Sequence, residues 1–523
     1  MDGFRSPSRR CLAPWEWVHY GDPMRLLLPL LLIPISLAQT PRNVVLILAD
    51  DMGLASLHAE HPGSGLPTPH LDQLAREGMS FTDGHSGSAV CSPTRYGLLT
   101  GRYSWRTTLK AGIVHQWGLP LIAPDRVTIA DVSHQAGLHT ACIGKWHLGW
   151  RWPKQGGGTT HKPSEIDYQL PIGGGALEAG FDHYFGDDVP NWPPYMWIEN
   201  DRATAMPTGT MKADSSNGVS AGPMMPGWSL EAVLPELTRR CVGYIRDRAA
   251  AKEPFFLYFP MTSPHTPISP SDAFQGQSGV SAYGDFLLET DWSVGQVLRA
   301  IDQSGLRENT LVVFVADNGT SPKANFATLA AGGVDLRGPW RGHKADVWEG
   351  GHRVPFLVRW PGVVEPGSRC DQPVGLTDVM ATVADALGVE LDPASAEDSR
   401  SLIGILKGVS KEPLPDGLVQ QSSTGQFAIR QGPWKLCFCP GSGGWSNPKD
   451  AKAKKLGLQE VQLYDLSVDP GEESNLALEQ SDRVQAMTEL LRKVVGAAPN
   501  DGDGWWGQLP WQKVLQAPQV GGR

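Results

Sequence analysis

The sequence predicts an α/β fold, a large mixed sheet of mostly parallel strands sandwiched by helices, with a smaller C-terminal α+β domain on an antiparallel sheet. Three observations predict it. Apolar, β-branched runs such as residues 44–49 show no alternation, which is typical of strands buried on both faces. Helical patterns alternate with these runs along the chain. Polar residues follow several runs, at the carboxyl ends of parallel strands where ligands bind.

The main elements follow in chain order. Helical patterns cover residues 128–136, closed by Gly137, and residues 283–301. The apolar runs predict buried strands at residues 44–49, 140–145, 255–259, 310–316 and 356–360.

The pattern changes beyond about residue 390. Two strand-like runs within residues 427–438 flank a turn at 431–433, which predicts a hairpin, and residues 462–466 predict a further strand. A helical pattern covers about residues 482–495. We therefore predict three parts: an N-terminal extension with a signal peptide at 1–38, a catalytic domain at 39–390 and an α+β subdomain at 391–523.

The N-terminal region resembles a targeting segment. Residues 26–38 form an apolar run that follows a basic residue and ends in a small-residue cleavage pattern. The run is shorter than the roughly 20 residues that span a bilayer and suits a secretory signal, although a lipid-facing anchor is an alternative. We expect Met24 to be the true start, so that Cys11 is absent from the mature protein. No other segment approaches transmembrane length, so we expect no stable membrane span.

Composition excludes some classes of partner and fold. The 523 residues carry a formal charge of −10 with a pI of about 5.8, whereas a duplex nucleic-acid binder normally presents a basic face. Hydrophobic residues at 41% and charged residues at 19% are ordinary for a globular chain. Seven cysteines in a chain this long are not a disulfide framework. We expect no nucleic-acid partner and a large core.

Four oxygen-bearing residues follow two of the predicted strands. Asp50 and Asp51 come after residues 44–49, and Asp317 and Asn318 come after residues 310–316. An all-oxygen set suits a hard divalent cation such as Ca²⁺. An Asp-Asp pair alone is more often a solvated loop, but two such clusters at the ends of parallel strands favour a metal site.

Cys91 precedes a short helical stretch at residues 96–100. Pro93 suits the first turn of a helix, which places Cys91 near the helix N-terminus. The dipole there favours an anion, so the thiol could have a lowered pKa and act as a nucleophile. The alternative is a buried, inert cysteine.

Further cationic and imidazole side chains follow other strands. Arg95, Lys145, His147, His265 and Lys344 are each weak signals alone. Together they would surround one anion beside a divalent metal and stabilise a leaving oxygen. The residues therefore favour hydrolysis of a sulfate or phosphate ester.

The polar blocks occur in a fixed order between about Asn43 and Pro361. They are Asp50-Asp51, Cys91-Ser92-Pro93-Thr94-Arg95, Leu99-Thr100-Gly101-Arg102, Gly144-Lys145-Trp146-His147, Pro264-His265-Thr266-Pro267, Asp317-Asn318-Gly319 and Gly342-His343-Lys344 with Glu349-Gly350-Gly351. This set closely resembles the type I sulfatases of the alkaline-phosphatase superfamily, most of all the arylsulfatase A and N-acetylgalactosamine-6-sulfatase branch. A weaker match continues through Leu463-Tyr464-Asp465-Leu466 and Asp469-Pro470-Gly471-Glu472.

The resemblance implies a chemistry for each block. Cys91 would be converted to formylglycine by a formylglycine-generating or an anaerobic sulfatase-maturating enzyme. One oxygen of the aldehyde hydrate would attack sulfur and expel the alcohol, and the second hydroxyl would then lose its proton and release sulfate. By this resemblance, one Ca²⁺ would be held by Asp50, Asp51, Asp317, Asn318 and an oxygen of residue 91. Arg95 would orient residue 91, and Lys145 and Lys344 would contact sulfate oxygens. His147 would accept a proton, and His265 would stabilise or protonate the leaving oxygen.

The predicted function is an exported sulfatase acting on aryl sulfates or sulfated sugars. A phosphonate monoester or phosphodiester hydrolase of the same superfamily is one alternative, and a non-catalytic, sulfated-glycan-binding relative is another. The only glycosylation sequon is Asn318-Gly319-Thr320, on a predicted metal ligand. Its position favours a secreted or periplasmic bacterial enzyme.

Substrate-specific residues are harder to predict. Trp192, Tyr195 and Trp197 could stack on a sugar ring, but aromatic side chains fill cores more often, and we expect them in the core. Candidates for the pocket entrance are His115, Asp188 and His352.

Overall fold

The computed structural model describes residues 40–410 and 417–496, and its main feature is a ten-stranded sheet. The strand order is β15-β2-β14-β13-β1-β12-β4-β7-β8-β9. The bounds in chain order are β1 Asn43–Ala49, β2 Met79–Phe81, β4 His139–Ile143, β7 His183–Gly186, β8 Ile198–Glu199, β9 Arg202–Ala203, β12 Phe255–Pro260, β13 Thr310–Ala316, β14 Phe356–Arg359 and β15 Ser368–Cys370.

The centre of this sheet is parallel and its flanks are mixed. Strands β13, β1, β12, β4 and β7 run in the same direction, whereas β14 pairs antiparallel with β13 and β8 antiparallel with β7. Every residue of β1 and of β13 is buried, because helices cover both faces of the sheet. The predicted mixed, mostly parallel α/β sheet is confirmed.

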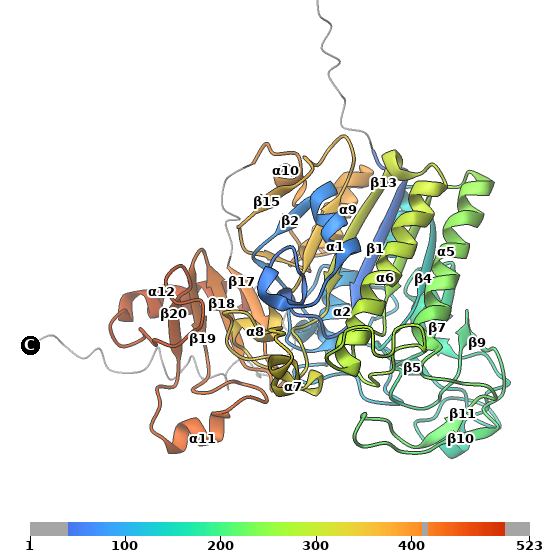
Figure 1. Ribbon diagram of the computed structural model, residues 1–523, viewed down its shortest axis with the longest axis horizontal. Helices are drawn as coiled ribbons and strands as arrows, with labels where there is room; N and C mark the ends of the chain where they lie inside the picture. Colours follow the sequence, from blue (N-terminus) through green and yellow to red (C-terminus); the bar gives the residue numbers. More distant parts are fainter. Residues whose placement is uncertain (1–39, 411–416, 497–523) are drawn as a thin grey trace, which may run out of the picture. The chain divides into compact units, whose positions relative to one another are not determined.

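Two groups of helices enclose the sheet. Helices α1 (Pro69–Glu77), α5 (Val233–Ala251) and α6 (Ala282–Gln303) pack together on the near face in Figure 1. The far face carries α2 and α9 (Figure 1), and α3 contacts both of them. The bounds of α2, α3 and α9 are Cys91–Thr100, Ile129–Gln135 and Asp378–Leu387.

Helix α2 is unusual because all ten of its residues are buried. It begins at Cys91 and ends at Thr100, and the following Gly101 has a φ of 59°, in the left-handed region that favours glycine. The predicted position of Cys91 near a helix N-terminus is confirmed, although the helix begins at Cys91 itself and is longer than the expected stretch at residues 96–100.

Short elements gather at the end of the sheet where β1 stops (Figure 1). They are β5 Trp150–Arg151 paired with β6 Gly173–Gly174, β10 Gly209–Met211 paired with β11 Gly222–Met224, and the helices α7 Phe326–Ala331 and α8 Glu349–His352. Elsewhere lie β3 Gly84–His85 paired with β16 Val374–Gly375, α4 Gly175–Glu178 and α10 Ile403–Leu406.

A separate sheet near the C-terminus is antiparallel, as predicted. Its order is β17-β18-β19-β20, with bounds Leu418–Gln421, Phe427–Gln431, Trp434–Cys437 and Gln462–Asp465. The connection from β19 to β20 includes α11 (Asp450–Lys455), and α12 (Ser481–Gly496) packs against β18 and β19.

The predicted domain boundaries stay predictions. The expected signal segment, Met24 and Cys11 lie outside the described residues. Within the described ranges, no helix is both long and apolar enough to cross a bilayer.

Candidate active site

The carboxyl ends of β1 and β13 bring the predicted oxygen ligands together. These strands are neighbours, and Ala49 pairs with Ala316 at their last positions. The Asp51 backbone N–H donates to Asp317 Oδ1 at 3.1 Å, and Asn318 Nδ2 donates to Asp51 Oδ1 at 2.7 Å. The adjacent registers therefore place both clusters in one buried group.

Gly319 allows a third segment to join this group. A Cβ atom at this position would lie 1.9 Å from the Gly350 carbonyl oxygen, so only glycine fits without displacing backbone. The Gly319 N–H also donates to the Gly351 carbonyl at 2.9 Å. This close contact of two backbones fixes the segment that carries Lys344 beside the ends of β1 and β13.

Two buried lysines neutralise two of the carboxylates. Lys145 Nζ lies 2.5 Å from Asp50 Oδ2, and Lys344 Nζ lies 2.5 Å from Asp51 Oδ1. Burial alone would raise the pKa of Asp50, but Lys145, His265 and Arg95 hold that pKa well below its ordinary value. The Asp50 carboxylate is therefore ionised near pH 7.

Arg95, on α2, joins the remaining carboxylate to the group. Its Nη2 lies 2.8 Å from Asp317 Oδ2 and 3.3 Å from Asp50 Oδ2, and its Nη1 donates to the Lys145 carbonyl at 3.2 Å. Three cationic side chains thus lie among three acidic side chains in a buried cluster.

Cys91 faces this cluster from the first turn of α2. Its Sγ lies 3.7 Å from Asp50 Oδ1 and 3.5 Å from Lys344 Nζ. Burial raises the pKa of the thiol to about 12, because desolvation of the thiolate outweighs the attraction of Lys145 and Lys344. The predicted lowering of this pKa is wrong, and the unmodified thiol is neutral and a poor nucleophile at pH 7.

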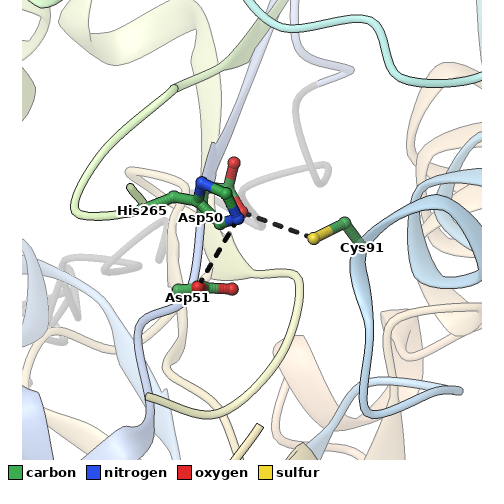
Figure 2. A group of neighbouring side chains, drawn as sticks. All are labelled: Asp50, Asp51, Cys91 and His265. Carbon is green, nitrogen blue, oxygen red and sulfur yellow. Dashed lines mark hydrogen bonds and ion pairs between the residues drawn. The ribbon is translucent and has the colours of Figure 1, made fainter. Parts of the chain in front are cut away.

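His265 lies next to the aspartates and Cys91. Its Nε2 lies 3.7 Å from Asp51 Oδ2, and the ligand atoms of Asp50, Asp51, Cys91 and His265 all lie within 4.8 Å of one another. Figure 2 shows His265 beside the two aspartates and Cys91 pointing toward Asp50. Burial lowers the pKa of His265 to about 4, so the imidazole is neutral near pH 7.

His147 lines the same pocket as Cys91. Its Nε2 lies 3.0 Å from the Val114 carbonyl, which can only accept, so Nε2 carries the proton. Its Nδ1 is buried and has no hydrogen-bond partner among the described residues. Burial lowers the pKa of His147 well below its ordinary value, so Nδ1 presents a lone pair that can take a proton.

The oxygen set fits a hard divalent cation. Asn318 Oδ1 is buried and unpartnered within the described part of the chain, next to three aspartates. A buried amide oxygen without a donor is costly unless something electropositive meets it. The donor atoms therefore suit Ca²⁺ or a similar ion.

A pocket of about 750 Å³ opens above the cluster. Cys91, His147, His265 and Lys344 line it, together with residues from several other segments. Such an arrangement suits hydrolysis of an anionic ester, because fixed cations and neutral imidazoles surround the side chain of residue 91.

The three aromatic residues near 192–197 differ in their surroundings. Trp192 lines the pocket and packs edge-to-face on His147, with ring centroids 5.5 Å apart. Tyr195 is buried, and Trp197 stacks on Phe185 at 5.1 Å, as core packing predicts.

The suggested entrance residues lie elsewhere. Asp188 accepts a hydrogen bond from the His147 backbone N–H at 3.2 Å, and neither it nor His115 is among the residues that line the pocket. His352 is fully buried in a different cluster. Sequence reasoning missed Trp445, which lines the pocket and follows a Gly/Ser-rich run, a pattern that could have marked an exposed aromatic loop.

A second cluster has the composition of a metal site but contains a lysine. His85, Glu349 and His352 are buried with ligand atoms close together. Lys435 Nζ from β19 lies 3.1 Å from Glu349 Oε1 and 3.1 Å from His352 Nε2, and 2.8 Å from Glu472 Oε1. The ammonium supplies the positive charge there, and it ties the C-terminal sheet to α8.

Comparisons with known proteins agree with this chemistry. A family model described as Sulfatase matches residues 42–389. N-acetylgalactosamine-6-O-sulfatase of Bacteroides thetaiotaomicron is 32% identical over 501 residues, which cover 86% of this chain and 93% of that protein. Arylsulfatase A of Homo sapiens is 34% identical over 477 residues, which cover 87% of each chain.

Solved structures agree as well. One from work on the metabolism of multiple glycosaminoglycans by Bacteroides thetaiotaomicron superposes with a TM-score of 0.73 at 29% identity, over 87% of this chain and 99% of its own. Phosphonate monoester hydrolase of Agrobacterium radiobacter has a TM-score of 0.57 at 18% identity, over 88% and 96%, and shares the fold.

The chain belongs to the sulfatase family, as the sequence motifs predicted. It is accordingly a sulfuric ester hydrolase that acts on sulfate esters of sugars or aryl compounds.

Proposed function

We propose that this protein is an exported bacterial sulfatase that works through a formylglycine made from Cys91 and through one bound Ca²⁺. The observation that carries the proposal is the position of Cys91, whose Sγ lies within 3.7 Å of both Asp50 and Lys344 in a buried cationic cup. A neutral thiol there has no evident chemistry, whereas an aldehyde hydrate supplies two hydroxyls, one to attack sulfur and one to release sulfate.

Four residues would hold the metal. The aspartates at 50, 51 and 317 would supply carboxylate oxygens, and Oδ1 of Asn318, which has no partner among residues 40–410 and 417–496, would supply the fourth ligand. When bound, Ca²⁺ supplies Lewis-acid polarisation and two positive charges. Those charges would attract the anionic group of the ester.

The remaining residues bind substrate and move protons. Lys145 and Lys344 would contact sulfate oxygens, and Arg95 would orient the side chain of residue 91 from the same helix. His265 would stabilise the leaving oxygen by donating to it from Nε2 in the protonated form, because the neutral ring keeps its one proton at Nδ1, beside the Thr266 carbonyl. The lone pair on His147 Nδ1, which has no partner among the described residues, would accept the proton that release requires.

Export and a bacterial source are supported by the sequence. A bacterial N-acetylgalactosamine-6-O-sulfatase is among the most similar relatives, and the single sequon places its asparagine at the fully buried Asn318. The apolar run at residues 26–38 would direct the chain across the membrane to the periplasm or medium.

Two measurements test the proposal. The protein, co-expressed with a maturating enzyme, should release sulfate from 4-nitrophenyl sulfate much faster than it cleaves bis(4-nitrophenyl) phosphate. Mass spectrometry should detect the aldehyde at residue 91. A preference for the phosphodiester would favour a phosphohydrolase. Full sulfatase activity in protein that carries only the thiol would contradict the modification. Binding of sulfated glycans without sulfate release would indicate a non-catalytic relative.

A further inference from the structure

The pocket is much larger than the sulfate group that the buried cup would hold. Its volume of about 750 Å³ lies in the range of roughly 300–1,000 Å³ that holds multi-ring ligands. Its mouth is built from separate segments of the chain, which contribute Trp192, Pro322, Lys323, Thr424 and Trp445. Most of the pocket is therefore available to the leaving group.

Trp445 is the most exposed large aromatic side chain at this mouth. Its exposed fraction is 46%, although nearly all other tryptophans of the described chain are buried or half-buried. It comes from the connection between β19 and α11, so the C-terminal sheet contributes one wall of a pocket whose base belongs to the large sheet. An exposed indole at a pocket mouth offers an apolar face to a flat ligand such as a sugar ring.

The backbone of Trp445 is fixed to the segment that carries Lys344. Asp346 is fully buried, and its Oδ1 accepts from the N–H groups of Trp445 at 2.8 Å and Ser446 at 3.0 Å. Its Oδ2 accepts from the His343 N–H at 3.0 Å and from Ser446 Oγ. Because the Asp346 carboxylate binds both segments, the position of the Trp445 backbone relative to the segment that carries Lys344 is fixed.

Gly444 makes this attachment closer still. A Cβ atom there would lie 2.2 Å from the Ala345 carbonyl oxygen, so the turn before Trp445 packs directly on backbone. A platform held this rigidly loses little entropy when a ligand stacks on it. The hydrogen bonds from Asp346 and the close packing of Gly444 are expected around a binding residue and not around a tryptophan in a mobile loop.

We propose that Trp445 is a specificity-determining residue that stacks on a sugar ring of the leaving group, so that sulfated oligosaccharides are preferred over small aryl sulfates. The inference rests on the proposed sulfatase function. Trp192, on a different segment and packed against His147, gives the pocket a second aromatic wall. Two aromatic walls and polar groups such as Thr424 match the apolar faces and hydroxyl edges of saccharides.

The test compares two substrates in the matured, full-length enzyme. Values of kcat/KM are measured on a series of sulfated di- and tetrasaccharides and on 4-nitrophenyl sulfate, for the parent, Trp445→Ala and Trp445→Phe. The loss caused by Trp445→Ala should be roughly tenfold greater on the preferred oligosaccharide than on the aryl sulfate, mainly through KM. Trp445→Phe, which keeps an aromatic face, should retain most of the preference.

Leu458→Ala is the matched control, because Leu458 is also 46% exposed and does not line the pocket. It should leave the ratio of the two kcat/KM values unchanged. Equal losses on both substrates in Trp445→Ala, or no loss on either, would overturn the role of Trp445. If the parent released sulfate from neither substrate, the proposed function itself would be wrong.

Discussion

Replacing Lys435 by methionine should destabilise the protein strongly, because this change leaves buried carboxylates without their cation. Lys435, Glu349 and Glu472 are all fully buried. Burial alone would lower the pKa of Lys435, but Glu472 and Glu349 raise it, so the ammonium is charged in the folded protein. In Lys435→Met, Glu349 keeps Arg430 at 3.2 Å, whereas Glu472 has no other ion-pair partner among the described residues.

The size of the effect follows from that geometry. Removing one partner of a buried ion pair costs about 3–5 kcal/mol, since the other charge stays desolvated. The unfolding entropy is about 2.1 cal/mol/K per residue, so in a cooperative unit of several hundred residues this loss corresponds to a fall in Tm of roughly 3–5 °C. The expected fall in Tm lies toward the lower end of this range, because Arg430 still pairs with Glu349 and because Glu472 can become neutral by taking up a proton.

Differential scanning calorimetry at pH 7.5 can measure the change. Lys454→Met on α11 is the matched control, because Lys454 is exposed and should change Tm by less than about 1 °C. Lys435→Met combined with Glu472→Gln should recover part of the loss, because the orphaned charge is removed. A Tm of Lys435→Met equal to that of the control would refute the reasoning.

Three further predictions concern the active site and its surroundings. Lys344→Ala should lower kcat/KM for an aryl sulfate by on the order of 10²-fold with the circular dichroism spectrum unchanged, and a near-normal rate would remove Lys344 from the site. Chelation should abolish sulfate release and Ca²⁺ should restore it, whereas restoration by Zn²⁺ alone would contradict the oxygen ligand set. Burial and Asp188 raise the pKa of Asp187 to about 7, and both Asp187 carboxylate oxygens lack partners in the described chain. This folded-state pKa exceeds the unfolded value of about 3.9, so the contribution of Asp187 lowers the free energy of unfolding as pH rises from 4 to 7. Asp187→Asn should therefore raise Tm at pH 8 and leave it unchanged at pH 4.

The large sheet could be predicted because its central strands are buried on both faces. The runs that form β1 and β13 are continuously apolar, and no competing helix pattern fits so short a segment. Strands β8 to β11 have only two or three residues each, which is too little for a pattern, and they lie in regions without a predicted element.

The site could be predicted where residues follow strand ends, and not where it depends on packing between distant segments. Asp50 and Asp317 lie together because β1 and β13 are neighbours, as the sequence indicated. The direction of the Cys91 pKa shift depends on complete burial, which a local motif does not reveal. Lys435 and Trp445 reach their positions only through the C-terminal sheet, whose contacts with the rest of the chain have no local signature.

The burial of α2 also determines when the proposed maturation can take place. A maturating enzyme would have to bind the backbone around residue 91 in its own active site, yet every residue of α2 is buried in the folded protein. Exposing a core helix requires an opening whose free energy approaches that of global unfolding. Under the proposed function, a maturating enzyme would therefore act on the newly made chain, and a molecule that folded before maturation would retain the thiol.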